Sequence, residues 1–254
     1  MRTIATVNQK GGSGKTTTAV NLAAALGEKG RRVLVIDLDP QCSATSWLGV
    51  HPEDKGIFSI FADNGNIGNV IINTDVSGVS VAPATAWLVG AEKALAGEVG
   101  AETLLKRAIG QLDNQYDYIL IDCPPALGIL TVNALAAVKE VLVPVEAHVM
   151  ALAGLAQLLN TVSLVQTRIN ADLAITGILA CRVDGRTRHS QEVVTQLRER
   201  FEDLVFATVI RENVRLAEAP SFGQPVTVYD SRSNGAADYR ALAAEVIAQE
   251  GRGE

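Results

Sequence analysis

The feature that most constrains this chain is a glycine-rich turn, KGGSGKTT, at residues 10–17. A β-branched apolar run at residues 4–7 precedes the turn, and an alanine- and leucine-rich segment at residues 19–26 follows it. This order predicts a strand, a tight turn and a helix. The three glycines let the backbone curl so that consecutive N–H groups converge, and the helix directs its positive end at the same volume. The turn is therefore predicted to bind the phosphates of a nucleoside triphosphate.

Two lysines in this turn have different expected roles. Lys15 would reach the outer phosphates, and the Thr16 hydroxyl would face a Mg²⁺ ion. The ordinary Walker pattern needs a glycine five residues before Gly14, where this chain has Gln9. The extra cation, Lys10, stands at the mouth of the turn, so it cannot easily fold back onto phosphates held inside its own loop and could reach a nucleotide in a second subunit. The residues expected to bind the nucleotide here are Lys10, Gly11, Gly12, Ser13, Gly14, Lys15, Thr16 and Thr17.

Two further apolar runs lead into acidic residues. Asp37 and Asp39 follow one of them, and Asp122 ends the other. Carboxylates at the carboxyl end of a strand, beside a phosphate loop, manage magnesium and water in nucleotide-hydrolysing proteins. Asp122 is predicted to hold magnesium through water, together with Thr16 from the glycine-rich turn. The alternative interpretation of Asp37 and Asp39 is that they only cap the helix that follows them.

Apolar runs and amphipathic segments alternate along all 254 residues, which is long enough to bury a large core in one domain. We expect a single P-loop domain over residues 1–254, of the α/β class, with a mostly parallel twisted sheet and helices on both faces. The expected strands are 4–7, 32–36, 69–72, 79–82, 116–122, 140–145, 173–181 and 205–210. The expected helices are 19–26, 88–95, 102–112, 130–138, 151–169, 191–201 and 230–249.

Composition argues against several classes of protein. The three cysteines are scattered and lack C-x-x-C spacing, which argues for a reducing cytosol and against a disulfide framework or a zinc site. The first strand starts at once, so no signal peptide is expected, and no apolar run approaches the roughly 18 residues of a membrane span. The protein is therefore expected in the cytoplasm. Its net charge of −6 weighs against non-specific nucleic-acid binding by the chain as a whole.

The turn KGGSGKTT resembles the deviant Walker motif of the ParA/MinD group of P-loop ATPases, and its sequence is most similar to that of ParA/Soj proteins. A second segment, RENVRLAEAPSFG at residues 211–223, resembles the signature that follows the last strand in ParA/Soj, so the similarity covers nearly the whole chain. The resemblance implies an ATP-dependent sandwich homodimer in which Lys10 contacts the partner's ATP. It also implies slow ATP hydrolysis with Mg²⁺, stimulated by a ParB-type centromere-binding protein, in chromosome or plasmid partition.

The resemblance assigns further roles to individual residues. Asp39 matches the residue that orients the attacking water, and Asp37 matches one that supports the metal shell. Asn213 and the backbone near Arg211 would face the adenine. Cys123 occupies a position at which different family members have different small residues, and we interpret it as a packing residue.

The family also uses arginines for a dimer-dependent surface that binds non-specific DNA, which would make the protein nucleoid-associated. Arg186 and Arg215 match such positions, and three more arginines lie nearby in the sequence: Arg182, Arg188 and Arg232. Glu212 and Asn234 depart from the family pattern and both remove positive charge. Residues 182–215 hold seven arginines against six acids, so the alternative is that these arginines pair with neighbouring acids on a solvated face.

Other functions share parts of this pattern. MinD ends in a basic amphipathic helix that lies on membranes, whereas residues 244–254 here are acidic and short of bulky apolar side chains, so no membrane partner is expected. Nitrogenase-type reductases need paired cysteine ligands, which these cysteines do not match. An orphan ParA-like ATPase that positions another cargo, or an ATP-gated binding protein that barely turns over, would share the motifs. The chain starts close to its first strand, so the helix-turn-helix extension of longer relatives is not expected.

Overall fold

The computed structural model describes residues 1–112, 115–148 and 151–250; residues 251–254 of the acidic tail lie outside the described residues. A seven-stranded sheet has the order β3-β4-β2-β5-β1-β6-β7. All neighbouring strands are parallel except β3 and β4, so the predicted α/β class with a mostly parallel sheet is confirmed. The strands are β1 (Arg2–Thr6), β2 (Val33–Asp37), β3 (Ile72–Asn73), β4 (Val79–Ala82), β5 (Tyr118–Asp122), β6 (Glu140–Glu146) and β7 (Ala174–Cys181).

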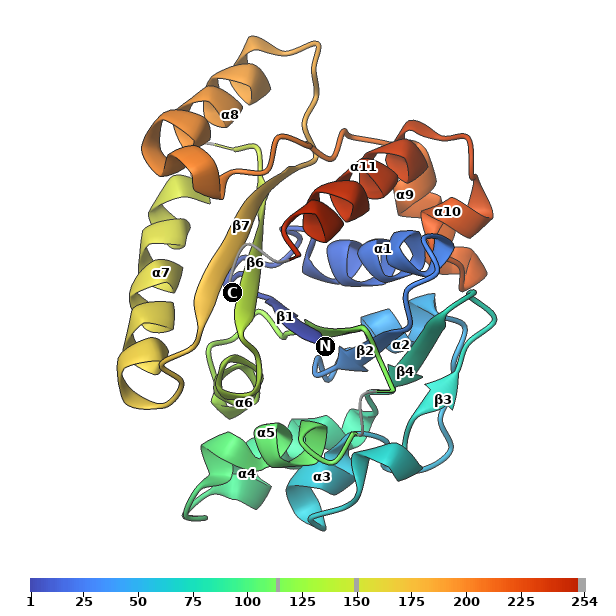
Figure 1. Cartoon of the computed structure of the whole chain (residues 1–254), viewed down its shortest axis with the longest axis vertical. Coiled ribbons are helices and arrows are strands. Elements are labelled where there is room, and N and C mark those ends of the chain that lie inside the picture. The colour runs from blue at the N-terminus through green and yellow to red at the C-terminus, as the bar shows by residue number, and fades with distance from the viewer. Residues whose placement is uncertain (113–114, 149–150, 251–254) are drawn as a thin grey trace.

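Helices cover both faces of this sheet (Figure 1). Helices α1 and α11 lie on one face, α3, α5 and α6 lie on the other, and α7 and α8 lie alongside β7. The α-helices are α1 (Lys15–Glu28), α2 (Ser43–Trp47), α3 (Phe58–Ala62), α4 (Ala91–Leu95), α5 (Leu104–Ile109), α6 (Ile129–Ala137), α7 (Ala151–Arg168), α8 (Arg188–Phe201), α9 (Val214–Glu218), α10 (Val226–Tyr229) and α11 (Asn234–Ala248). Short 3₁₀ helices are η1 (Ile67–Asn69), η2 (Ala86–Gly90), η3 (Ala101–Thr103), η4 (Glu202–Leu204) and η5 (Ala219–Phe222). Within the described part of the chain, no helix is long and apolar enough to cross a membrane.

The sequences of the central strands are continuous apolar runs because both faces of these strands are buried. In β2, Val33 and Val35 join the core under α1 and α11, whereas Leu34 and Ile36 join the core on the opposite face. Strand β5 alternates between the two cores in the same way. Successive side chains of a strand point to opposite faces, so a single run of apolar residues supplies both cores.

The register of the parallel strands gathers the predicted acids at one edge of the sheet. Asp122 at the end of β5 lies level with Asp37 at the end of β2 and with Thr6 at the end of β1. The glycine-rich turn leaves β1 at this same edge. Ligands of open α/β sheets bind outside the carboxyl ends of the strands, and this edge is therefore where a site is expected.

The predicted strand at residues 205–210 is wrong. The segment runs beside β7 but makes only isolated bridges, from Val205 to Ile178 and from Arg211 to Val183. Between them, the amide of Thr208 donates to the side chain of Glu245 on α11 (2.9 Å) and not to β7. A continuous ladder cannot form where an amide is diverted in this way, although the apolar residues of the segment pack as a strand's would.

Residues 67–112 are more irregular than the sequence predicted. The strand expected at 69–72 begins only at Ile72, after the 3₁₀ helix η1. The helices expected at 88–95 and 102–112 each begin as a 3₁₀ helix and continue as a short α-helix, α4 or α5. Periodicity alone does not separate these two helix types when a segment is only two or three turns long.

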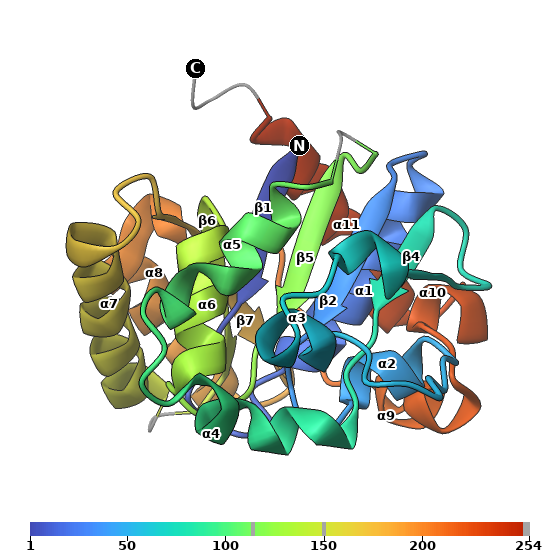
Figure 2. The same ribbon diagram turned by 90° about the horizontal axis from the view of Figure 1, so that it is seen from below.

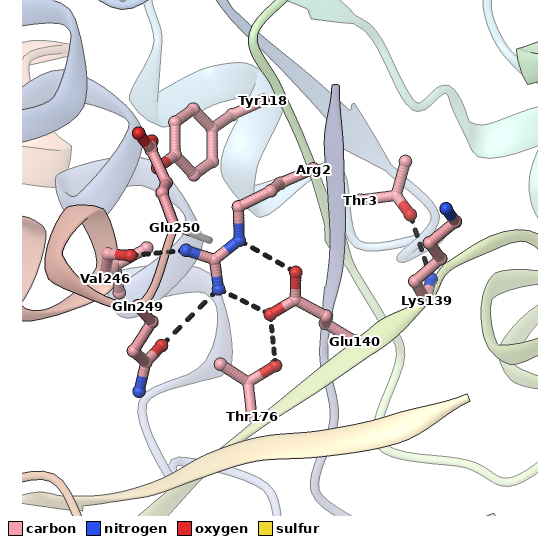
Figure 3. A network of polar contacts seen from close by, with 9 residues as sticks. All are labelled: Arg2, Thr3, Tyr118, Lys139, Glu140, Thr176, Val246, Gln249 and Glu250. Atoms are coloured by element: carbon pink, nitrogen blue, oxygen red, sulfur yellow. Dashed lines mark hydrogen bonds and ion pairs between the residues drawn. The ribbon is translucent and has the colours of Figure 1, made fainter. Parts of the chain in front are cut away.

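Arg2 joins the first strand to the last helix at the opposite edge of the sheet (Figure 3). Its guanidinium donates to both carboxylate oxygens of Glu140 (2.8 and 2.5 Å) and to the backbone carbonyl of Val246 on α11. Thr176 on β7 donates to the same carboxylate (2.6 Å). Bidentate Arg–carboxylate pairs fix geometry as well as charge, so this cluster orients α11 across the sheet.

Candidate functional site

The glycine-rich turn has the backbone that a phosphate-binding loop needs. Gly12 and Gly14 have φ angles of 74° and 96°, a left-handed conformation that favours glycine, and α1 starts immediately afterwards at Lys15. Asn8 braces the loop, because its amide donates to the carbonyl of Pro144 (2.7 Å) and its oxygen accepts from the amide of Lys10 (3.0 Å). Sequence reasoning missed Asn8, since its partner lies 136 residues away.

Lys15 is a buried cation beneath this loop. The residue is only 6% exposed, and its ammonium donates to a distant acceptor, the carbonyl of Lys10 at 3.4 Å. Burial lowers the pKa of Lys15, and the nearby carboxylates of Asp122 and Asp39 oppose that effect. An ammonium held in this way is suited to an anionic ligand, as the sequence predicts for a phosphate.

The two acids level with each other across β2 and β5 differ in their partners. Asp37 accepts hydrogen bonds from the backbone and hydroxyl of Thr45 (2.9 and 2.7 Å) and from the amide of Asp39 (3.1 Å). Burial raises the pKa of Asp37 to about 6, although the bonds from Thr45 lower it. Asp122 is fully buried, and among the described residues neither of its carboxylate oxygens finds a hydrogen-bond partner.

Two effects hold the pKa of Asp122 well above its usual range: burial first, and then the neighbouring Asp37 carboxylate. The Thr16 hydroxyl and the Lys15 ammonium act in the opposite direction, which places both side chains near this carboxylate. A buried carboxylate without a partner is costly unless a cation or a hydrogen bond compensates it. The donor set is all oxygen, which suits Mg²⁺.

The site could hold Mg²⁺ by protein side chains alone or together with water and phosphate. The described residues contain no group of three or more His, Cys, Asp or Glu side chains that could hold a metal ion. Mg²⁺ usually keeps several waters and uses one or two protein oxygens plus the phosphates of its substrate. The Asp122 carboxylate and the Thr16 hydroxyl fit that mode.

Asp39 lies on the loop between β2 and α2. It is 8% exposed, and its carboxylate accepts from the amide of Gln41 (2.9 Å). Its electrostatic effect on Lys15 shows that the two side chains are near each other. The structure therefore brings together Lys15, Thr16, Asp37, Asp39 and Asp122, all of which the sequence predicted for one site.

Lys10 is placed on the rim of the loop. Its ammonium forms an ion pair with Glu146 at the end of β6 (2.6 Å), and Arg182 approaches the other oxygen of the same carboxylate (3.2 Å). The Lys10 side chain is 44% exposed, in contrast to the buried Lys15. Glu146 was not among the predicted site residues, because nothing next to it in the sequence indicates its contact with the turn.

A cavity of about 780 Å³ opens beside the loop. Gly12, Gly14 and Thr17 line one side, and Arg211 and Asn213 line another. The resemblance assigned the last two residues to the adenine, and the cavity joins them to the phosphate-binding turn. Their side chains already have partners in the fold.

Those partners restrict how Arg211 and Asn213 meet a ligand. The guanidinium of Arg211 pairs with Asp238 on α11 (2.6 Å). The side-chain oxygen of Asn213 caps α9 by accepting from the amide of Arg215 (2.8 Å). Asp238 was not predicted from the sequence, although it fixes the arginine that lines this cavity.

Three of the five predicted DNA-binding arginines form ion pairs within the chain. Arg186 makes two contacts with Asp184 (2.9 and 3.0 Å), and Arg215 lies between Glu218 (2.7 Å) and Asp230 (3.2 Å). The third is Arg182, which pairs with Glu146 as described above. These pairs match the solvated face that the sequence left open as an alternative. All three side chains nevertheless remain more than half exposed, and exposed pairs of this kind are weak.

The fold and this site define a P-loop nucleoside-triphosphate hydrolase. The family model AAA_31, described as an AAA domain, matches residues 1–175. The chain is 49% identical to the sporulation initiation inhibitor protein Soj of Bacillus subtilis, over 96% of this chain and 98% of that protein. It is also 49% identical to the chromosome-partitioning ATPase Soj of Thermus thermophilus, over 98% and 96% of the two chains.

A solved structure gives the same result for the fold. The crystal structure of cobyrinic acid a,c-diamide synthase from Mycobacterium smegmatis, with an ATP analogue and magnesium, has a TM-score of 0.87 and 37% identity, covering 100% of this chain and 97% of that one. The chain belongs to the ParA/Soj family of chromosome-partitioning ATPases.

Proposed function

We propose that this chain is one domain that acts as a nucleotide-gated homodimer, using ATP and Mg²⁺ to drive chromosome or plasmid partition with DNA and a ParB-type protein. One observation carries the proposal: a buried ammonium, that of Lys15, lies under one glycine-rich turn with the buried carboxylate of Asp122, whose oxygens have no hydrogen-bond partner among the described residues. Both groups gain a partner when a metal–triphosphate complex binds.

The residues divide the chemistry of ATP hydrolysis between them. The backbone amides of the turn and the Lys15 ammonium would bind the phosphates, and Asp39 would orient a water molecule in line with the γ-phosphate. Thr16 and Asp122 would hold Mg²⁺, which neutralises charge on the phosphate oxygens when it is bound. Asp37, whose two oxygens already accept from Thr45 and from the amide of Asp39, would support this arrangement rather than contact the metal.

The homodimer is supported by the position of Lys10. Its half-exposed ammonium lies on the rim of the loop and contacts a carboxylate there, so it is accessible to a second molecule. Contact with the partner's ATP would make dimerisation depend on nucleotide, and hydrolysis would return the dimer to monomers. Nucleotide state would then control attachment to the nucleoid in the cytoplasm.

The partition role follows the two relatives at 49% identity, which are both named Soj. The amide synthesis that gives the Mycobacterium smegmatis protein its name belongs to that protein, which has lower identity to this chain. DNA binding is proposed through Arg186 and Arg215, with Arg182, Arg188 and Arg232 nearby. Because the dimer would carry two copies of this surface, it would contact more phosphates than a monomer and bind DNA more tightly.

The first experiment tests the nucleotide-gated dimer. The mass of the Asp39→Ala protein, measured by light scattering with ATP, should be that of a dimer, and the mass with ADP should be that of a monomer. Lys10→Ala in the same background should remain monomeric with ATP while it still binds the nucleotide. A fully dimeric Lys10→Ala protein would contradict the contact to the partner's ATP.

The second experiment tests the DNA surface. Fluorescence anisotropy with random duplex DNA should show binding that requires ATP, and Arg215→Ala should reduce the slope of log K against log salt by about 0.9 per lost contact. Arg168→Ala, on the exposed end of α7, is the matched control and should leave the slope unchanged. DNA binding that ignores both ATP and Arg215→Ala would defeat this assignment.

A further inference from the structure

An exposed apolar ridge follows strand β4. Trp87 and Val89 on η2 are 59% and 74% exposed, and these two residues form what we call the Trp87 ridge. Leu88 between them is buried, and the Trp87 ring stacks on Phe58 of α3 with the ring centroids 6.3 Å apart. The buried neighbours hold the ridge in a fixed position, so its exposure does not come from a loose loop.

The segment that carries the ridge also holds most of the chain's net charge. Residues 51–103 contain seven acidic and two basic side chains, a net charge of −5 out of −6 for the whole chain. One of the two lysines, Lys55, already pairs with Asp63 (2.8 Å). The exposed acids of this segment include Glu53, Asp54, Glu92 and Glu98. An apolar ridge in an acidic setting favours a partner that is basic and carries an apolar anchor.

Two contacts connect this segment to the nucleotide site. The hydroxyl of Thr45 donates to Asp37 (2.7 Å) and accepts from the amide of Ala84 (2.9 Å), three residues before Trp87. On the other side of the ridge, Glu92 of α4 packs on the loop that follows Asp122. A Cβ atom added to Gly128 in that loop would lie 2.6 Å from the Glu92 carboxylate. Figure 2 shows α4 next to α6, the helix that this loop enters.

The charge of the segment selects among the possible occupants. A second copy of this chain that docked by the same face would bring the same acidic residues, and DNA or an anionic membrane would bring phosphates, so like charges would oppose these three arrangements. A basic protein segment meets no such repulsion. Its apolar anchor would bury Trp87, an aromatic residue of the type enriched at interface hot spots.

We propose that the Trp87 ridge docks a short basic segment of the ParB-type partner, with one apolar side chain against Trp87 and Val89. Binding there acts on Asp37 through Ala84 and Thr45, and on the loop after Asp122 through Glu92, so the surface couples partner binding to ATP turnover. This inference rests on the proposed function for the identity of the partner. The ridge itself can be tested without that partner.

The first test uses short synthetic peptides and the native protein. The chain has two tryptophans, and Trp47 is only 6% exposed, so acrylamide quenching of fluorescence reports mainly on Trp87. A peptide of Lys and Leu should protect Trp87 from acrylamide, and salt should weaken that protection. Matched peptides of Lys and Ser, or of Glu and Leu, should not protect it. Equal protection by the Glu–Leu peptide, or no protection by any peptide, would overturn the proposal.

The second test measures ATP hydrolysis with the purified ParB-type protein. The double variant Trp87→Ala/Val89→Ser should keep basal turnover but need about tenfold more partner for half-maximal stimulation. Leu164→Ser, at another exposed apolar residue (54%), is the matched control and should behave as wild type. Glu98→Lys should also weaken stimulation, whereas Glu199→Lys on α8 should not.

The outcomes separate the two proposals. Equal stimulation of wild type and the double variant would overturn the docking surface and leave the partition function intact. If the ParB-type protein does not stimulate the wild type at all, the partner assignment fails. The peptide measurement then decides whether the Trp87 ridge is a docking surface for a basic segment.

Discussion

Replacing Glu146 by Gln should strengthen the proposed ATP-dependent dimer. In the structure, Lys10 must leave Glu146 before its ammonium can contact a nucleotide in a second molecule, because the two groups form an ion pair at 2.6 Å. That hydrogen bond is also the main reason why the pKa of Glu146 is lowered. The variant keeps the shape of the side chain and removes its charge, so Lys10 is released without a cavity.

The size of the effect follows from the exposure of the pair. The Lys10 side chain is 44% exposed and Glu146 is 23% exposed, so solvent screens their attraction. Exposed ion pairs of this kind contribute roughly 0.2–1 kcal/mol. Two lysines are released for each dimer, which gives about 0.4–2 kcal/mol, and the dissociation constant should fall by roughly 2- to 30-fold.

Sedimentation equilibrium with ATP measures this constant directly. The Asp39→Ala background prevents turnover during the run, and Arg182→Ala is the control, because it removes the other cation on Glu146 and leaves Lys10 paired. The control should leave the dissociation constant near that of the background protein. A Glu146→Gln protein that dimerises no better than the background, or less well, would refute the argument that this ion pair holds Lys10 back.

Lys15→Ala should abolish nucleotide binding in calorimetry, because it removes the buried ammonium under the turn. Asp39→Ala should keep its affinity for ATP and lose most ATP turnover. Normal turnover by the Asp39→Ala protein would exclude Asp39 from positioning water. Arg32→Ala should raise the pKa of Asp117 from about 2 towards 3.8, since hydrogen bonds from Arg32 lower it. A depressed carboxyl pKa stabilises the fold above the unfolded value, so the stability difference between wild type and Arg32→Ala should shrink as pH falls from about 4 to about 2. Carboxyl NMR titration and urea unfolding measure the two effects, and an unchanged Asp117 pKa would contradict the assignment.

The parts of the site that the sequence could predict are those set by neighbouring residues. A glycine-rich turn after a β-branched run fixes the phosphate loop locally, and the acids Asp37 and Asp122 stand at the ends of apolar runs. Parallel strands bring their carboxyl ends to one edge, so these acids were expected to meet without knowing the strand order. The resemblance supplied what spacing does not, the role of Asp39 in orienting water, whereas the position of Lys10 at the mouth of the turn already indicated a contact with a second subunit.

The parts that sequence reasoning missed depend on distant partners. Thr45 donates two hydrogen bonds to one oxygen of Asp37, and Glu146 forms the ion pair that positions Lys10, yet neither residue lies in a recognisable motif. The failed strand at 205–210 has the same cause, because the acceptor of the Thr208 amide belongs to the last helix. A local apolar pattern specifies burial but does not specify which backbone amide is diverted to a side chain.

The ion pairs of the predicted DNA-binding arginines bear on why DNA binding would need the dimer. In a single protomer, Arg186 and Arg215 each lie beside a carboxylate, so a phosphate that approaches them also meets a negative charge. Each pair contributes little because it is exposed, and a phosphate can displace the acid, but the gain per contact is small. Affinity for DNA rises with the number of phosphates neutralised, and a dimer doubles that number. If each arginine–phosphate contact is weak, a monomer binds DNA poorly and only the dimer makes enough contacts to stay bound. Because the proposed dimer needs ATP, weak contacts would make DNA binding depend on ATP more steeply than strong contacts would.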